Sequence, residues 1–211
     1  DFSQIESDRP QIEVNQRFPL FYDELRPFFV EGAEIFEVAA PVTVVHTRTV
    51  VDPDYGAKLS GKVGRLSLGL LAANDAAPGR VDDPESPLFE QKAQTYIGRA
   101  RYNLYSESHV GAVITDREFL DSHSRLAGID GNLRLGATRT VNFNLMGTRL
   151  RDLNGVETDG YLTDIRFRQN GRNLDCTLLG YQVSPDFGTD VGFVRRTDQR
   201  VLMTNMGYTF Y

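Results

Sequence analysis

The sequence has few of the residues that catalytic, metal-binding and disulfide-linked domains need. It contains no tryptophan, three histidines and a single cysteine, Cys176. One cysteine excludes a disulfide within the chain and a zinc site built from several thiolates. No Gly-x-Ser-x-Gly elbow, phosphate-binding glycine loop or His-Glu-x-x-His pair occurs either. We therefore expect a protein that is not an enzyme and that binds no cofactor and no metal.

A basic excess and long apolar runs are also lacking. The chain carries 23 Lys and Arg against 29 Asp and Glu, a net charge of −6, which argues against a nucleic-acid partner. No stretch of about 18 apolar residues is present, so a transmembrane helix is excluded. The sequence opens with Asp-Phe-Ser-Gln rather than with a basic stretch and an apolar run. We expect any export signal to have been removed or to lie outside this sequence.

Proline is absent between Glu90 and Ser184, as expected where every backbone N–H joins a β-ladder. In this region apolar and polar residues alternate with a period of two, which is typical of strands with one apolar face. Residues 41–211 are therefore predicted to form an all-β, antiparallel meander of about nine strands. Eight of these strands can be bounded, at residues 57–62, 66–73, 96–104, 126–136, 140–149, 161–167, 174–180 and 201–210.

Turn-forming residues separate these runs. Gln169-Asn170-Gly171-Arg172 predicts a two-residue hairpin turn with positive φ at both central positions. Residues 105–108 and 136–138 predict further tight turns, whereas residues 73–94, 117–124 and 185–191 are longer, polar and predicted to be loops. Short turns that alternate with long loops are typical of a barrel with one loop-rich rim.

Residues 1–40 differ in composition from the rest of the chain. Their apolar residues keep neither a period of 2 nor one of 3.6, and their three prolines interrupt any long helix. We predict a compact, irregular segment whose rings need another surface to cover them. It holds six of the 13 phenylalanines: Phe2, Phe18, Phe21, Phe28, Phe29 and Phe36.

Alternation with a period of two fits both a soluble β-sandwich and a transmembrane β-barrel. The better runs, such as 96–104 and 126–136, are longer than the about 5–6 residues of an average globular strand and match the about 9–11 residues that cross a bilayer. Glycine and alanine also recur on the apolar faces, where lipid tails can cover them. The pattern favours the barrel and leaves the sandwich open.

The few chemically distinctive residues have ordinary structural interpretations. His46 is expected on a strand facing a polar interior rather than acting as a general base. His109 and His123 border predicted turns and are expected at the surface. Asp52-Pro-Asp54 has carboxylates that could bind calcium, but a turn is the favoured interpretation. Cys176 lies within an apolar alternation and is expected to be buried or to face lipid.

Three stretches carry a resemblance to a known family. They are Arg17-Phe-Pro-Leu-Phe-Tyr-Asp-Glu-Leu-Arg-Pro-Phe-Phe-Val-Glu-Gly-Ala-Glu-Ile-Phe36, then His46-Thr-Arg-Thr49, then Asp54-Tyr-Gly-Ala-Lys-Leu-Ser-Gly-Lys-Val-Gly64. They resemble an uncharacterised family of predicted outer-membrane β-barrels, and the resemblance continues through residues 102–119 and 192–198. In that family a family 9 carbohydrate-binding domain often lies upstream. This sequence lacks that domain and stops at Tyr211 where family members continue with further strands, so we expect a fragment of a larger barrel.

The resemblance implies a transmembrane β-barrel in the outer membrane of a Gram-negative bacterium, with residues 1–40 as a plug or periplasmic cap. The polar sides of the strands would line its lumen. Arginine pairs there, Arg99 with Arg101 and Arg166 with Arg168, could form a salt network with Asp130 and Asp164 or select anionic and polar solutes. The candidate lumen-lining residues are Arg99, Arg101, Asp130, Asn132, Arg134, Asn142, Asn144, Asp164 and Arg166.

We therefore expect a non-enzymatic outer-membrane protein that passes or docks a polar solute, for example a glycan-derived one. Membrane lipid would surround it, and other outer-membrane or periplasmic proteins are candidate partners. The alternative is a soluble or surface β-sandwich that binds carbohydrate through Tyr55, Tyr96, Tyr102 and Tyr161. Glycoside hydrolysis is a third hypothesis, which is disfavoured because Glu31, Glu34 and Glu37 lack a helical pattern that would pair them.

Overall fold

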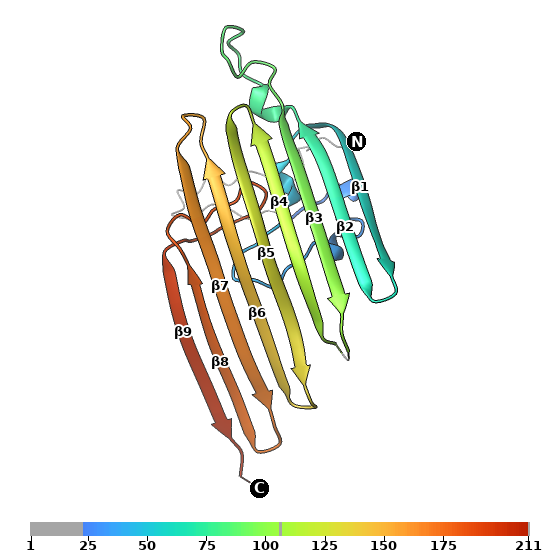
Figure 1. Ribbon diagram of the computed structural model, residues 1–211, viewed down its shortest axis with the longest axis vertical. Helices are drawn as coiled ribbons and strands as arrows, with labels where there is room; N and C mark the ends of the chain where they lie inside the picture. The colour runs from blue at the N-terminus through green and yellow to red at the C-terminus, as the bar shows by residue number, and fades with distance from the viewer. Residues whose placement is uncertain (1–22, 106, 211) are drawn as a thin grey trace.

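One antiparallel β-sheet dominates the computed structural model, which describes residues 23–105 and 107–210 (Figure 1). Each strand pairs with the next one along the chain, so the spatial order is β1 to β9. The all-β antiparallel meander predicted from the sequence is confirmed. The sheet is not closed, and β1 and β9 are its edges, which is compatible with part of a barrel. The strands are β1 (Pro53–Val63), β2 (Leu66–Asp75), β3 (Ala93–Asn103), β4 (His109–Phe119), β5 (Ser122–Leu135), β6 (Arg139–Arg151), β7 (Glu157–Asn170), β8 (Leu174–Val183) and β9 (Gln199–Tyr208).

The strands are staggered along the sheet. At one end short turns join β1 to β2, β3 to β4, β5 to β6 and β7 to β8, and each turn lies lower than the one before it in Figure 1. At the other end the connections 76–92 and 184–198 are long, and the first contains the 3-10 helix η4 (Ala77–Gly79), whereas the connections 120–121 and 152–156 are short. The two long connections therefore lie at the same end, as predicted for residues 73–94 and 185–191.

Two local predictions are wrong. Residues 117–124 were expected to form a loop, but Phe119 pairs with Ser122 across a tight turn in which Leu120 has a φ of 53°. The hairpin near Asn170 is present, but Asn170 pairs with Asp175 and no residue from Asn170 to Asn173 has a positive φ. The connection is therefore longer than the predicted two-residue turn.

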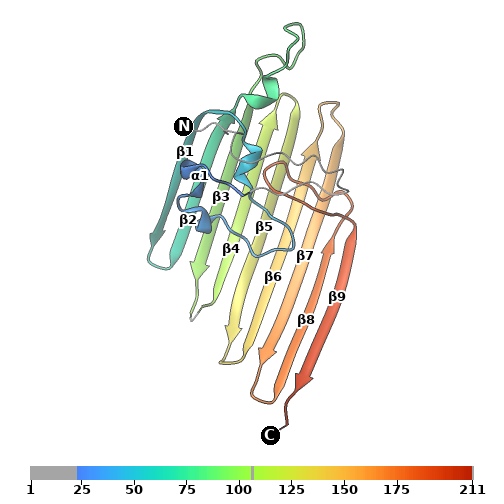
Figure 2. The same cartoon turned by 180° about the vertical axis from the view of Figure 1, so that it is seen from behind.

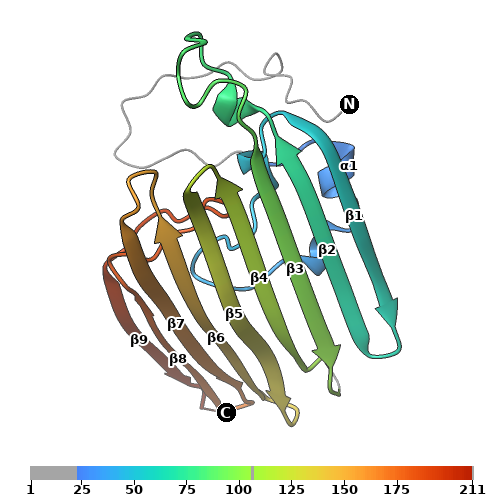
Figure 3. The same cartoon turned by 45° about the horizontal axis from the view of Figure 1, so that its top comes forward.

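An irregular segment, residues 23–52, crosses one face of the sheet (Figure 2). It contains helix α1 (Pro27–Val30) and the 3-10 helices η2 (Ala33–Ile35) and η3 (Thr47–Thr49). The loop 184–198 lies on the same side, where Thr43 and Phe193 form a β-bridge (Figure 3). We call this side the inner face and the opposite side the outer face.

The boundaries of this segment differ from the prediction in one respect. The first strand begins at Pro53, so irregular structure continues beyond the boundary expected at residue 40. Phe2, Phe18 and Phe21 lie outside the described residues. Among the described residues, no helix is long and apolar enough to cross a membrane.

The aromatic rings of the segment pack against the sheet. Phe29 and Phe36 are 2% and 5% exposed and form a core with Leu71 and Ile97 of the inner face. Phe36 lies directly over β2, where a Cβ added at Gly69 would come within 2.9 Å of its ring. The sheet thus provides the covering surface that these rings were predicted to need.

A second core lies under the loop 184–198, where Phe187 packs against Leu126, Met146 and Leu162. The loop backbone crosses β7 so closely that a Cβ at Gly160 would lie 2.4 Å from the Cα of Phe187. Gly160→Ala is therefore expected to displace Phe187 and to lower the free energy of unfolding by about 1–3 kcal/mol in chemical denaturation. Gly147→Ala is the matched control.

Gly147 lies on the neighbouring strand, and a Cβ there would meet only one backbone oxygen, at 3.9 Å. Its replacement should leave stability unchanged or raise it slightly, because alanine restricts the unfolded chain. Equal effects of the two substitutions would show that the loop does not rest on β7 in this way.

Candidate functional site

Strand register places all nine candidate lumen-lining residues on the inner face. Asp130 of β5 is opposite Asn144 of β6, which in turn is opposite Asp164 of β7. A second row of opposite inward residues lies two positions further along the strands and consists of Asn132, Asn142 and Arg166. The period-two pattern was therefore sufficient to group these residues on one face.

The centre of the inner face is a buried ion pair. Arg99 donates to both carboxylate oxygens of Asp130, with Nη1–Oδ1 and Nη2–Oδ2 distances of 2.5 and 2.8 Å. Arg99 is 3% exposed and Asp130 is 5% exposed. A bidentate arginine–carboxylate pair fixes both planes, and burial makes the loss of either partner costly.

Gly111 of β4 allows this pair to form. It lies between β3 and β5, and a Cβ at this position would be 2.5 Å from Nη1 of Arg99 and 2.8 Å from Oδ1 of Asp130. The guanidinium group therefore crosses β4 in space that any larger residue would occupy.

Amides link the remaining polar residues of the row. Asn144 donates from Nδ2 to Oδ2 of Asp164 and to the carbonyl of Ala39, both at 2.9 Å. Asn142 donates to Asn132 at 3.0 Å. Asp164 was predicted, with Asp130, as a possible partner for the arginines of this face, but it accepts its hydrogen bond from Asn144. The bond to Ala39 also ties the irregular segment to the sheet.

Two residues of this site were not predicted from the sequence, because the alternation did not give the bounds of β4. His109, the first residue of β4, faces inward opposite Asn132, with Nε2 3.9 Å from Oδ2 of Asp130. Glu107, in the turn before β4, pairs with Arg134. Two outward charges in the second half of this strand, Asp116 and Glu118, hide its alternation.

A cavity of about 450 Å³ separates the inner face from the irregular segment. Arg101, His109 and Asp130 line it on the sheet side. Glu34, Glu37 and the apolar residues Phe36, Val42 and Val44 line it on the segment side. The cavity therefore combines a cationic wall with an acidic and apolar one.

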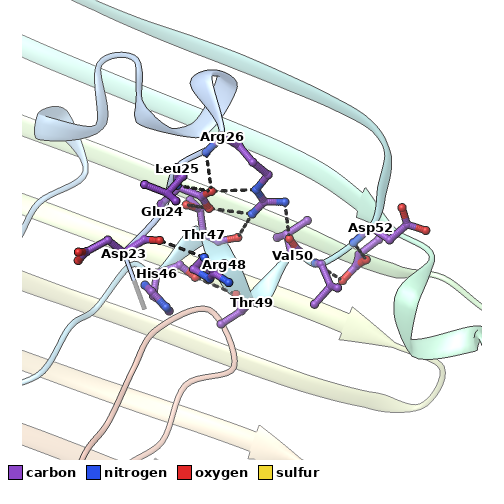
Figure 4. Close-up of polar contacts among 12 residues, drawn as sticks. Asp23, Glu24, Leu25, Arg26, His46, Thr47, Arg48, Thr49, Val50 and Asp52 are labelled. Carbon is purple, nitrogen blue, oxygen red and sulfur yellow. Dashed lines mark hydrogen bonds and ion pairs between the residues drawn. The ribbon is translucent and has the colours of Figure 1, made fainter. Parts of the chain in front are cut away.

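A polar cluster holds the start of the segment in place (Figure 4). Arg26 donates to both oxygens of Glu24, to the carbonyl of Val50 at 2.7 Å and to that of Thr47 at 3.0 Å. Thr47 donates its hydroxyl to Glu24 at 2.8 Å, and the guanidinium of Arg26 stacks 4.2 Å from the ring centre of Phe29. We call Glu24, Arg26 and Thr47 the clamp, because they join residues 23–30 to residues 47–50.

The clamp shifts the titration of two nearby groups. Burial raises the pKa of the Glu24 carboxyl, but hydrogen bonds from Arg26 and Thr47 and the Arg26 charge outweigh burial, so its net pKa lies below the ordinary 4.5. Burial lowers the pKa of His46 below the ordinary 6.5, although the nearby Glu24 charge opposes this. In both cases the unfolded chain binds protons more readily than the folded one.

Acidification is therefore expected to loosen the segment. Each group stabilises the folded chain fully at a pH above its pKa in the unfolded chain, which is 6.5 for His46 and 4.5 for Glu24. This stabilisation is lost as the pH falls from that value toward the lower pKa of the folded chain. Limited proteolysis should show residues 23–52 cleaved faster as the pH falls from 7 to 4. In the Glu24→Gln variant the increase in the cleavage rate below pH 4.5 should disappear. Cleavage that is equally slow across this range would contradict the prediction.

The outer face is apolar over most of its height. On β2 to β9 a band of outward positions contains no Asp, Glu, Lys or Arg, yet large side chains such as Ile114, Leu145 and Ile165 are about half exposed. We call it the apolar band. Exposed apolar areas of this extent mark interaction or membrane surfaces. It consists of the outward residues within 66–72, 96–102, 110–114, 127–135, 141–147, 161–167, 174–180 and 202–208.

Charged residues border the band toward the end with the longer connections. Arg125 pairs with Asp116 and Glu118 across β4 and β5, and Arg149 pairs with Asp159 across β6 and β7. On β6 the band is bounded by Arg139 and Arg149, ten residues apart and thus about 33 Å along the strand. Cys176 lies within the band and is half-buried.

Tyrosines lie at both borders of the band. Tyr96 and Tyr161 are next to the charged border, and Tyr102 and Tyr208 are near the turn end. All four are about half exposed. Tyr55, also proposed for sugar binding, lies on the same face of β1 and is 64% exposed.

The other distinctive residues take local structural roles. His46 is not on a strand but directly precedes η3, where its backbone carbonyl accepts a hydrogen bond from the Thr49 hydroxyl. Its ring makes an edge-to-face contact with the ring of Phe193. Asp52 and Asp54 pair with Arg80 and Lys92 respectively. Among the described residues, no group of three or more acidic, histidine or cysteine side chains could hold a metal ion.

Comparison of the chain with protein-family models, with curated proteins and with solved structures found no match. The resemblance to outer-membrane barrels drawn from the sequence therefore stays a prediction.

Proposed function

We propose that this chain forms part of the wall of an outer-membrane β-barrel, a non-enzymatic protein through which a polar solute passes or at which it docks. One observation carries the proposal. The two faces of the sheet have the polarity of a membrane barrel: Arg99, Asp130 and Asn144 are buried inside, and an apolar band is exposed outside. A sheet in water has its apolar side covered and its charged side solvated.

The dimensions of the band support a membrane-spanning role. Most strands contribute four consecutive outward residues to it, and the two charged positions that flank it on β6 are about 33 Å apart along the strand. Barrel strands tilt by about 35–45°, which reduces such a length to roughly the 25 Å height of a barrel's apolar surface. Tyrosines at both borders resemble the aromatic girdles of such barrels.

On this proposal the irregular segment is a plug. Residues 23–52 fill the inner face toward the charged border and are held there by the clamp and by Asn144. The rest of the inner face, with Arg166 and Arg168, would be open to water. A solute would then meet a polar wall on one side and the plug on the other.

Membrane fractionation tests the proposal. The full chain, exported in a Gram-negative host, should be recovered from the outer membrane only with detergent. It should also migrate differently on a gel before and after boiling, because barrels resist unfolding by detergent at room temperature. Recovery from the soluble fraction, with no change on boiling, would overturn the proposal.

The alternative, a soluble or surface carbohydrate-binding domain, is favoured by one observation. Tyr55, Tyr96, Tyr102 and Tyr161 are all exposed on the same face, where they could stack on sugar rings. This function predicts a soluble protein whose binding to immobilised glycan is lost when Tyr96 and Tyr161 are replaced by alanine.

A further inference from the structure

The inner face carries positive charge although the chain as a whole is negative. The inward positions of the nine strands hold eight basic residues and four acidic ones, whereas the net charge of the chain is −6. A concave surface lined by one sign of charge concentrates ions of the opposite sign. The basic residues are Lys58, Lys62, Arg99, Arg101, Arg117, Arg134, Arg166 and Arg168, and the acidic ones are Asp75, Asp130, Asp164 and Asp175.

Half of these basic residues already have partners. Arg99, Arg117 and Arg134 pair with Asp130, Asp190 and Glu107. Lys58 donates to the carbonyls of Phe28 and Glu31. No acidic partner occurs among the described residues for Lys62, Arg101, Arg166 or Arg168. These four cations are available to a ligand.

Arg101 is the only one of the four that lines the 450 Å³ cavity. Its Nε is buried and has no hydrogen-bond partner. Asp130, the carboxylate on the same wall of the cavity, has both oxygens engaged by Arg99. A partly buried guanidinium without a counter-ion, beside the imidazole of His109, matches the planar, two-oxygen geometry of a carboxylate.

The opposite wall restricts what else the ligand can be. Glu34 and Glu37 can only accept hydrogen bonds when ionised, so they favour hydroxyl donors and disfavour additional negative charge. Phe36 and Val42 offer an apolar surface to a carbon skeleton. The volume lies within the about 300–1,000 Å³ of small-molecule pockets.

We propose that the cavity between residues 34–45 and Arg101 binds a small hydroxylated monocarboxylate, with its carboxylate on Arg101 and its hydroxyl groups toward Glu34 and Glu37. This inference rests on the proposed function, because it names the class of solute that the barrel would pass or dock.

Three probes with the same six-carbon chain test the assignment: gluconate, its neutral counterpart sorbitol, and the dianion sorbitol 6-phosphate. Binding is measured by calorimetry on the full chain in detergent micelles at low salt. Gluconate should bind at least about 10-fold more tightly than either of the others, since a charge-assisted bidentate contact contributes about 1.5–3 kcal/mol, equivalent to about 10–150-fold. Equal binding of sorbitol, or tighter binding of the phosphate, would overturn the inference, as would no binding of gluconate.

A matched pair of variants separates a site from a general field. Arg101→Gln should weaken gluconate binding by about 10-fold or more, while Arg166→Gln, the same change of charge outside the cavity, should alter it less than about 2-fold. If the two variants weaken binding equally, the positive face attracts anions without a specific site and the inference fails. Circular dichroism establishes that both variants are folded.

The two proposals fail in different ways. If the folded protein is found in the outer membrane but does not bind gluconate, only the ligand assignment is refuted. A soluble protein that binds gluconate through Arg101 refutes only the barrel.

Discussion

Leu145→Arg is expected to destabilise the protein in a bilayer by about 2–4 kcal/mol, the cost of placing arginine near the midplane on the lipid-facing side of a barrel. Leu145 lies in the middle of the apolar band on β6 and is 48% exposed. In a water-soluble protein, replacing such an exposed leucine would change stability by only about 0.5 kcal/mol. Urea titration of the protein folded into lipid vesicles measures the difference.

Asn205→Arg is the control for this substitution. Asn205 is exposed on the inner face of β9, so an arginine there would stay in water. Its effect on the unfolding midpoint should be small in vesicles. If Leu145→Arg were as harmless as Asn205→Arg, the apolar band would not face hydrocarbon.

Arg99→Met is expected to lower the free energy of unfolding by about 3–5 kcal/mol, because it leaves the carboxylate of Asp130 buried without its main partner. Asp130 is only 5% exposed, and its other partner, the imidazole of His109, lies 3.9 Å away and is charged only when protonated. Chemical denaturation of the two proteins, compared at the same pH, gives the difference directly.

The double variant Arg99→Met with Asp130→Leu separates a buried charge from lost packing. Removing both charges should recover much of the stability that Arg99→Met alone loses. Arg149→Met, which breaks the exposed pair with Asp159, should have little effect. A double variant as unstable as the single one would mean that the loss comes from packing around the methionine.

Period-two alternation predicted the faces of the sheet because the alternation is directly imposed by strand geometry. For Asp130, Asn142 and Asn144 the pattern alone was enough to group them on one side. It could not supply their partners. Asp164 accepts a hydrogen bond from Asn144, and not from Arg166, because Asn144 lies directly opposite Asp164 on the neighbouring strand. The register between two strands cannot be predicted from the pattern of one strand alone.

Features that arise from contacts distant in sequence were not predictable. The cavity depends on residues 34–45 folding back over Arg101 and His109, and nothing local specifies that docking. Strand β4 was not predicted because its outward residues change from the apolar Val110 and Ile114 to the charged Asp116 and Glu118. This change falls at the charged border of the apolar band. Periodicity alone interprets that change as a loop.

The parity of the meander has a consequence for any closed form of this sheet. β1 and β9 are both odd-numbered in a sheet whose neighbours are all antiparallel, so the two edges run in the same direction. Joining them directly would create one parallel pair. A ring with only antiparallel neighbours instead requires an odd number of additional strands between β9 and β1, whichever polypeptide supplies them.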